Sequence, residues 1–285
     1  MSFLAFLILL LPIAAKAQPL RPAASSQLSL AEIEEFLLKA SIVADRELSP
    51  GAPKYRRRIT LDDGKRKHDA AVETEDGTTP TTRNYRFNVA AFELDKALDL
   101  HMAAPSVLRT VNGLPASAMW WVDDVAMSER DRRSKRIEPP DPDSWNKQMQ
   151  AVRVFDELMS NPYRNTSPED PSLSTSPDSG HPPDDSWVEL LITRAWRVWL
   201  IDHTGTFRTR KQLRHLQSLT QCDRGLLRKL QELNKEAFLQ KLGKYLSPEQ
   251  LDALEVRRTL IVKRFQELIA SKGEGAVLYD LPQRQ

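Results

Sequence analysis

Two acidic residues, Glu189 and Asp202, lie at the open end of a β-hairpin predicted over 187–201, with its turn at Arg194-Ala195. With that turn, Glu189 faces Leu200 across the ladder, and Asp202 is its diagonal neighbour on the same face. Carboxylate oxygens are ligands that Mg²⁺ prefers, so this spacing predicts a metal site completed by phosphates and waters. The alternative makes Glu189 a solvent-facing strand residue and Asp202 the cap of the next segment.

Other residue types that often perform catalysis lack partners at a useful spacing. The histidines at positions 68, 101, 181, 203 and 215 show no H-x-x-x-H or H-E-x-x-H pattern for a metal. The chain contains no G-x-S-x-G sequence of a serine hydrolase. Cys222 is the only cysteine, which excludes an intramolecular disulfide framework, and we expect a buried structural thiol there.

Length and composition limit the class of protein that must position these residues. The chain has 285 residues, 40% hydrophobic and 28% charged, which is typical of a globular protein. This length suits one domain of two lobes or two small domains. The 41 Lys+Arg and 39 Asp+Glu residues give a net charge of +2. A dedicated nucleic-acid binder usually has a clear basic excess, so we expect no nucleic-acid partner.

The N-terminus carries the pattern of a secretory signal. Residues 3–15 are uncharged and interrupted only by Pro12, a run too short for a membrane helix, which needs about 20 apolar residues. Ala15-Lys16-Ala17 is a small-x-small cleavage pattern. We therefore predict a signal peptide over 1–17, cleaved after Ala17, and a flexible leader over 18–28. The mature protein is then secreted or periplasmic and has no transmembrane span. An uncleaved anchor or a buried helix is the alternative.

The first half of the mature chain reads as mixed α/β structure. Ser29 and Glu32 have the spacing of a capping box and predict a helix start. Two hairpins are predicted, one over 58–74 and one over 106–122 that turns at Asn112-Gly113. Between them, apolar residues at helical spacing predict a buried helix over 87–100. Residues 29–127 therefore form the expected N-lobe.

A change in composition separates this part from the rest of the chain. Residues 128–143 are charged and rich in proline, which favours a hinge. Ser144 is the expected cap of a helix that reaches Met159. Residues 162–186 contain six of the 19 prolines and predict a disordered insertion, which includes the glycosylation sequon at Asn165.

The C-terminal part is predicted to be mostly helical. Leucines between 213 and 219 mark one helix, Asp223 caps the next, and Ser247-Pro248 starts a long helix that ends near Gly273. Residues 206–270 hold twice as many basic as acidic residues, which favours either a solvated helical surface or a face for an anionic protein partner. The expected fold is α+β, with a helical C-lobe over 144–285.

Two stretches carry a resemblance to a known group. Residues 154–165 read V-F-D-E-L-M-S-N-P-Y-R-N, and residues 199–208 read W-L-I-D-H-T-G-T-F-R. They resemble the loop F-D-x-L-x-x-N-x-D-R-x-x-x-N and the metal motif I-D-x-x-x-x-F of atypical kinases of the HipA-like, phosphoinositide-kinase-like and secretory-pathway Golgi casein-kinase type. The resemblance implies a two-lobed kinase-like fold with ATP and Mg²⁺ as cofactors. It implies that Asp202 binds the metal on the nucleotide phosphates, that Glu189 lies near the second ligand, and that Asn161 and Arg164 belong to the catalytic loop.

The loop departs from this pattern at the position that matters most for catalysis. Tyr163 falls where the family has its catalytic aspartate. A phenol has a pKa of about 10, against about 3.9 for an aspartate, so it is a poor proton acceptor at neutral pH. Loss of a positioned base lowers a reaction rate by about 10² to 10⁴.

The phosphate-binding residues of the N-lobe depart from the pattern as well. Glu73 falls where the family has a phosphate-contacting lysine. Lys65 and Lys67 lie in the preceding turn and could replace that lysine at the phosphates. The alternative is that both are ordinary charged residues of the surface. Asn88 falls where a glutamate would pair with that lysine, with Glu93 as the alternative, and no Gly-rich phosphate loop is present.

Three functions remain open at this point. The first is an exported, catalytically degenerate kinase-like protein, a pseudokinase that acts by binding a nucleotide, a metal or a protein. The second is an active phosphotransferase that uses Asp202 and Glu189 and takes its base from Asp170 or Asp184 on the long loop. The third is a secreted α+β interaction module unrelated to kinases.

Overall fold

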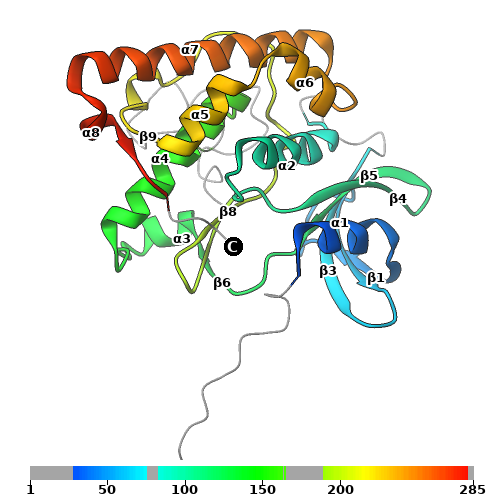
Figure 1. Ribbon diagram of the computed structural model, residues 1–285. Helices are drawn as coiled ribbons and strands as arrows, with labels where there is room; N and C mark the ends of the chain where they lie inside the picture. The colour runs from blue at the N-terminus through cyan, green and yellow to red at the C-terminus, as the bar shows by residue number, and fades with distance from the viewer. Residues whose placement is uncertain (1–27, 76–82, 163, 165–188, 282–285) are drawn as a thin grey trace, which may run out of the picture.

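The computed structural model describes residues 28–75, 83–162, 164 and 189–281, and these form an α+β fold, as predicted (Figure 1). A five-stranded antiparallel sheet holds most of the first half of the chain, and helices dominate the second half. No helix of these residues combines the length and the apolar character that a membrane span requires.

The large sheet joins the two predicted hairpins. Its strands are β1 (Ser41–Glu47), β2 (Arg56–Asp62), β3 (Lys67–Thr74), β4 (Ser106–Val111) and β5 (Leu114–Trp120), in the order β1-β2-β3-β5-β4. The β4–β5 hairpin turns at Asn112-Gly113, where both residues have a positive φ, of 51° and 80°. This is the conformation that a two-residue hairpin turn requires. The edge strand β1 was not predicted, because its exposed residues show no apolar alternation.

Helix α1 (Leu30–Lys39) packs over one face of this sheet and closes a first hydrophobic core. Both hydrogen bonds of the predicted capping box form between Ser29 and Glu32. Ile33, Phe36 and Leu37 are buried in the same core as strand residues such as Ile59 and Val72. The other face of the sheet carries buried polar residues such as Glu73 and Ser117, and it contributes Glu73 and Arg56 to the candidate site.

Helix α2 (Arg86–Leu98) connects the sheet to the helical half, since it contacts β4 and β5 on one side and α5 and α6 on the other (Figure 1). Its apolar residues belong to a second hydrophobic core, with α4 (Pro142–Met159), α5 (Arg224–Glu232), α6 (Lys235–Leu242), α7 (Pro248–Lys272) and α8 (Glu274–Val277). The described part of the chain thus contains two separate apolar cores.

Two small sheets complete the helical half. β6 (Val125–Ser128), β7 (Leu190–Thr193) and β8 (Val198–Leu200) form one, and β9 (Cys222–Asp223) pairs in parallel with β10 (Leu278–Tyr279) in the other. Cys222 is fully buried, as predicted, and its thiol is free. Its pKa is raised well above the ordinary value by burial.

Several predicted elements differ from the structure. The hinge expected over 128–143 contains α3 (Glu129–Ser134), which Ser128 caps, and β6 ends at the same residue. Helix α4 is capped by Asp141 and begins at Pro142, so Ser144 is already inside its first turn. The helix predicted over 213–219 is only a short 3₁₀ turn, η5 (Leu216–Ser218). The long helix α7 begins and ends where its caps predict.

Candidate functional site

Asp202 follows β8 and is engaged by two arginines from distant parts of the chain. It is 6% exposed and adopts a left-handed φ of 52°. Nη2 of Arg83 lies 2.6 Å from Oδ1 and 2.8 Å from Oδ2, while Nη2 of Arg56 donates to Oδ2 at 2.7 Å. The hydroxyl of Thr204 also donates to Oδ1, at 2.7 Å. Both carboxylate oxygens therefore accept charge-assisted hydrogen bonds, the strong type in proteins.

Glu73 shares the same two arginines. It lies directly opposite Arg56 in the β2–β3 ladder. Its Oε1 is 3.0 Å from Nε of Arg56 and 3.1 Å from Nη2 of Arg83. We call Arg56, Glu73, Arg83 and Asp202 the Asp202 cluster. It joins two strands of the large sheet, the segment before α2 and the end of β8.

The charges of the Asp202 cluster compensate one another. Burial opposes the charged form of Asp202, but the guanidinium groups of Arg56 and Arg83 hold its pKa well below the usual range. Burial and the Asp202 charge together raise the pKa of Glu73. Burial alone would lower the pKa of Arg83, and the two carboxylates reverse this and raise it.

The loop after α4 forms a second buried cluster around Arg164. This residue has no exposed side-chain surface, although the sequence placed it in a disordered insertion. Its Nη2 donates to Oδ1 of Asp156 at 2.9 Å, and its Nη1 donates to the carbonyl of Ile201 at 3.0 Å. Asn161 also donates to Oδ1 of Asp156, at 2.9 Å. Arg164 therefore ties the end of α4 to the residue before Asp202. Tyr163 lies outside the described residues.

Glu189 lies beside both clusters, but the predicted register is wrong by one residue. Leu190, not Glu189, pairs with Leu200, and the carbonyl of Glu189 accepts from the N–H of Ile201 at 3.0 Å. The cause is the turn, which extends through Trp196, a residue with a φ of 57°. Glu189 is still close to Asp202. Burial raises the pKa of Glu189 well above the usual range, and the negative charge of Asp202 raises it further.

Comparison with known proteins assigns no family. A scan against protein-family models and a search of the curated proteins gave no match to this chain.

The arrangement fits guanidinium groups better than Mg²⁺. A metal at Asp202 would lie against the cationic Arg56 and Arg83, which already occupy both oxygens. Oε2 of Glu189 is buried without a hydrogen-bond partner among the described residues, and its closest cation is Arg164, at 3.8 Å. Within these residues no group of three or more His, Cys, Asp or Glu side chains is placed to hold a metal. The site at Asp202 and Glu189 stays a prediction.

The substitutes expected for the phosphate-binding lysine lie at the surface. Lys67, the first residue of β3, is largely exposed and pairs with Asp62 at 3.3 Å, and Lys65 is exposed in the turn before it. Asn88 is buried and structural: its Oδ1 accepts from the N–H of His203 at 2.7 Å, and its Nδ2 donates to Ser117 at 3.1 Å. Glu93 pairs with Lys96 along α2. Asp170 and Asp184 lie outside the described residues.

The segment that follows Asp202 is fixed by two buried charged residues. Glu157 accepts backbone hydrogen bonds from Arg214 and His215, at 2.8 and 3.0 Å. Arg257, on α7, donates to the carbonyls of Leu158, Arg208 and Arg210. This clamp keeps the end of α4 and the segment after β8 in one arrangement.

Sequence reasoning missed the two arginines that decide the chemistry of the site. Arg56 had a usable signal, because extending the ladder of the predicted hairpin places it opposite Glu73. Arg83 had none, since it pairs with a residue 119 positions away.

Proposed function

We propose that the chain is an exported, two-lobed kinase-like protein in which ion pairs replace the phosphotransfer centre, so that it acts by binding a protein partner. The observation that carries this proposal is the engagement of both Asp202 oxygens by Arg56 and Arg83. The glutamate at position 73 supports it further, because the resemblance places a phosphate-contacting lysine there.

Energetics favour ion pairs over a metal at Asp202. Each hydrogen bond to a charged group contributes about 1.5 to 3 kcal/mol. Binding of Mg²⁺ would break the contacts of Arg56 and Arg83 and leave one buried and one partly buried guanidinium group beside a dication. Glu73 would lose both of its arginines at the same time. ATP phosphates would meet the same buried carboxylates.

A thermal-shift titration of the chain from Gln18 onward tests this proposal. A ligand that binds only the native state raises the melting temperature. We expect that addition of millimolar Mg²⁺-ATP shifts neither the melting temperature of the wild type nor that of Asp202→Asn. A rise of the melting temperature in the wild type that is absent in Asp202→Asn would indicate a nucleotide site and contradict the proposal.

An active phosphotransferase is the second candidate, favoured by one observation. The buried Oε2 of Glu189, which has no hydrogen-bond partner among the described residues, is a free oxygen ligand. This candidate predicts slow autophosphorylation with Mg²⁺ or Mn²⁺ that disappears in both Asp202→Ala and Glu189→Gln. Absence of phosphorylation in the wild type, under conditions where a control kinase is active, rules it out.

A further inference from the structure

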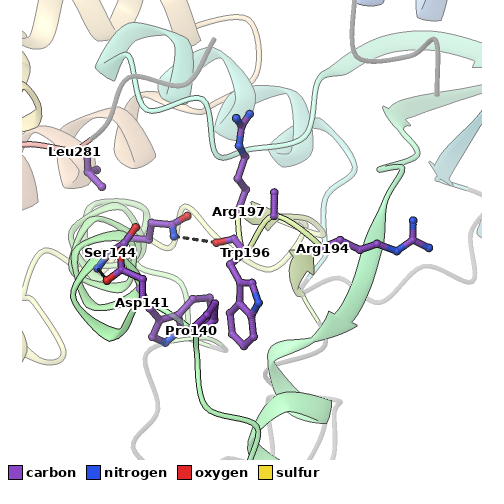
Figure 2. Close-up of a pocket in the computed structure, with 10 residues that line it drawn as sticks. Pro140, Asp141, Ser144, Arg194, Trp196, Arg197 and Leu281 are labelled. Atoms are coloured by element: carbon purple, nitrogen blue, oxygen red, sulfur yellow. Dashed lines mark hydrogen bonds between the residues drawn. The ribbon is translucent and has the colours of Figure 1, made fainter. Parts of the chain in front are cut away.

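A surface pocket of about 480 Å³ lies between the start of α4 and the turn of the β7–β8 hairpin (Figure 2). Its volume is within the range of pockets that bind ligands, about 300 to 1,000 Å³. Asp202 follows the opposite end of the same hairpin, so this pocket is separate from the Asp202 cluster.

Two tryptophans belong to the apolar part of the pocket, beside Pro140, Ala195 and Leu281. The rings of Trp145 and Trp196 pack edge to face, with centroids 5.8 Å apart. Trp145 is only 6% exposed and is covered by the guanidinium of Arg132, whose centre lies 5.1 Å from the ring. Trp196 is only partly buried. It therefore offers accessible indole surface to an occupant.

The turn that carries Trp196 is held in place before anything binds. Gln148, on α4, donates to the carbonyl of Trp196 at 3.0 Å and accepts from the N–H of Val198 at 3.1 Å. The N–H of Arg197 donates to the hydroxyl of Thr193, at 3.1 Å. A surface that is already ordered loses little conformational entropy when it binds, which favours affinity.

Of the three charged residues that line the pocket, two are compensated by other groups and one is not. Arg194 pairs with Asp124 at 2.8 Å. Asp141 accepts from the N–H of Ser144 at 3.1 Å and caps α4, where the positive end of the helix dipole compensates it. The guanidinium of Arg197 is exposed and makes no hydrogen bond or ion pair with any residue that the structure describes. Figure 2 shows the Trp196 ring and the Arg197 side chain leaving the turn in opposite directions. The wall of the pocket thus offers an accessible indole and, apart from it, a cation that has no counter-ion among the described residues.

We propose that this pocket binds a short peptide segment of a partner protein, with an apolar or aromatic side chain on Trp196 and an Asp or Glu carboxylate on Arg197. Tryptophan and arginine are the residue types that most often dominate binding energy in protein interfaces. Arginine binds carboxylates through paired hydrogen bonds. The inference rests on the proposed partner-binding function and names the chemistry of the partner.

Selection from a library of displayed random twelve-residue peptides, with the chain from Gln18 onward as bait, tests the proposal. We expect the enriched peptides to combine an aromatic or large aliphatic residue with an acidic residue at a recurrent spacing. The dissociation constant of a synthetic copy should rise about tenfold or more in Trp196→Ala and in Arg197→Glu. Lys211→Glu is the matched control, because it reverses an exposed cation that does not line the pocket, and it should leave the affinity unchanged.

Three results would overturn the inference. One is the failure of any peptide to be enriched, and another is binding that neither substitution weakens. The third is displacement of the peptide by equimolar 3-phenylpropanoate, which would assign the pocket to a small aromatic acid. If Trp196→Ala lowers the melting temperature of the protein, the affinity of Arg197→Gln for the peptide decides instead, because the exposed side chain of Arg197 is not needed for folding. Mg²⁺-ATP melting curves report on the Asp202 cluster, so failure of the proposed function remains distinguishable from failure at this pocket.

Discussion

Arg83 and Asp202 are 119 positions apart in the chain, yet Nη2 of Arg83 lies 2.6 and 2.8 Å from the two carboxylate oxygens of Asp202. Arg83 stands in the segment before α2, and Asp202 follows β8. With Arg56 and Glu73 from the large sheet, they form a buried ionic connection between elements of the two apolar cores. Such a connection specifies one relative placement of these elements, because each charge has few other partners.

Arg83→Met should destabilise the protein strongly. It leaves two buried carboxylates with only Arg56, and removal of one partner from a buried ion pair usually costs about 3 to 5 kcal/mol. Urea denaturation of the variant and the wild type measures the difference in free energy of unfolding. Arg194→Met is the matched control, since its exposed pair with Asp124 contributes at most about 1 kcal/mol. Equal losses of unfolding free energy in the two variants would mean that Arg83 contributes no more to stability than an exposed ion pair does.

Glu189→Gln should make the protein more stable at neutral and basic pH. Burial raises the pKa of Glu189, so the native state binds this proton more tightly than the unfolded state does. Its contribution is favourable below the unfolded pKa, about 4.3, and is lost as the pH rises through the higher native pKa. Denaturation at pH 4 and at pH 8 should show a gain of about 1 to 3 kcal/mol in the variant at pH 8 only. A loss at pH 8 would mean that the charge is needed beside Arg164.

Asp202→Asn should change stability with pH in the opposite sense. The arginines hold the native pKa of Asp202 far below its unfolded value of about 3.9. Its stabilisation is therefore present above that value and is lost as the pH falls towards the native pKa. The variant should be much less stable than the wild type at pH 7, and the gap should narrow in acid denaturation below pH 4. A stability difference between the variant and the wild type that does not change with pH would mean that the substitution acts through packing.

Arg257→Met should release the segment after Asp202. Arg257 is fully buried, and its guanidinium holds the carbonyls of Arg208 and Arg210. Without it, we expect faster cleavage by trypsin at Arg208, Arg210 and Lys211, because proteases need a segment that can leave the fold. Mass spectrometry of timed digests identifies the sites. Lys263→Met, an exposed change on the same helix, removes its own trypsin site but should leave cleavage at Arg208, Arg210 and Lys211 at the wild-type rate.

Ser247→Ala should lower stability by about 1 kcal/mol. The hydroxyl oxygen of Ser247 accepts from the N–H of Gln250, and the N–H of Ser247 donates to Oε1 of Gln250 at 2.9 Å. The change to alanine removes the first of these two bonds and therefore half of this capping box. Thermal denaturation measures the effect. The control is Gln266→Ala, on an exposed position inside α7, where alanine is at least as good a helix former. A similar loss in both variants would show that the cap contributes little.

Local signals predicted much of the fold. Capping boxes at Ser29 and Ser247 and the Asn112-Gly113 turn mark element ends through contacts within a few residues, and all three form in the structure. The strand β1 and the pairing of β9 with β10 depend on partners distant in sequence, and their residues carry no apolar alternation of useful length. Local patterns therefore cannot reveal them.

The sequence singled out acidic residues that the structure brings together, but the metal site predicted for them stays a prediction. Glu189 lies near Asp202, as the hairpin pattern predicted, although in a register shifted by one residue. Glu73 also lies near Asp202, and the sequence had singled it out only as the residue at the lysine position of the resemblance. The hydrogen bonds of Arg83 and Arg164 cross between elements, so no spacing along the chain announces them. One additional turn residue, Trp196, was enough to shift the strand register.

The only thiol of the protein is enclosed where β9 meets β10, with its exposed surface reduced to 0%. Alkylating reagents attack the thiolate, which burial disfavours at Cys222, so modification must wait until this sheet separates from the helices around it. The rate of alkylation under native conditions is then a direct measure of how often the C-terminal part of the chain opens.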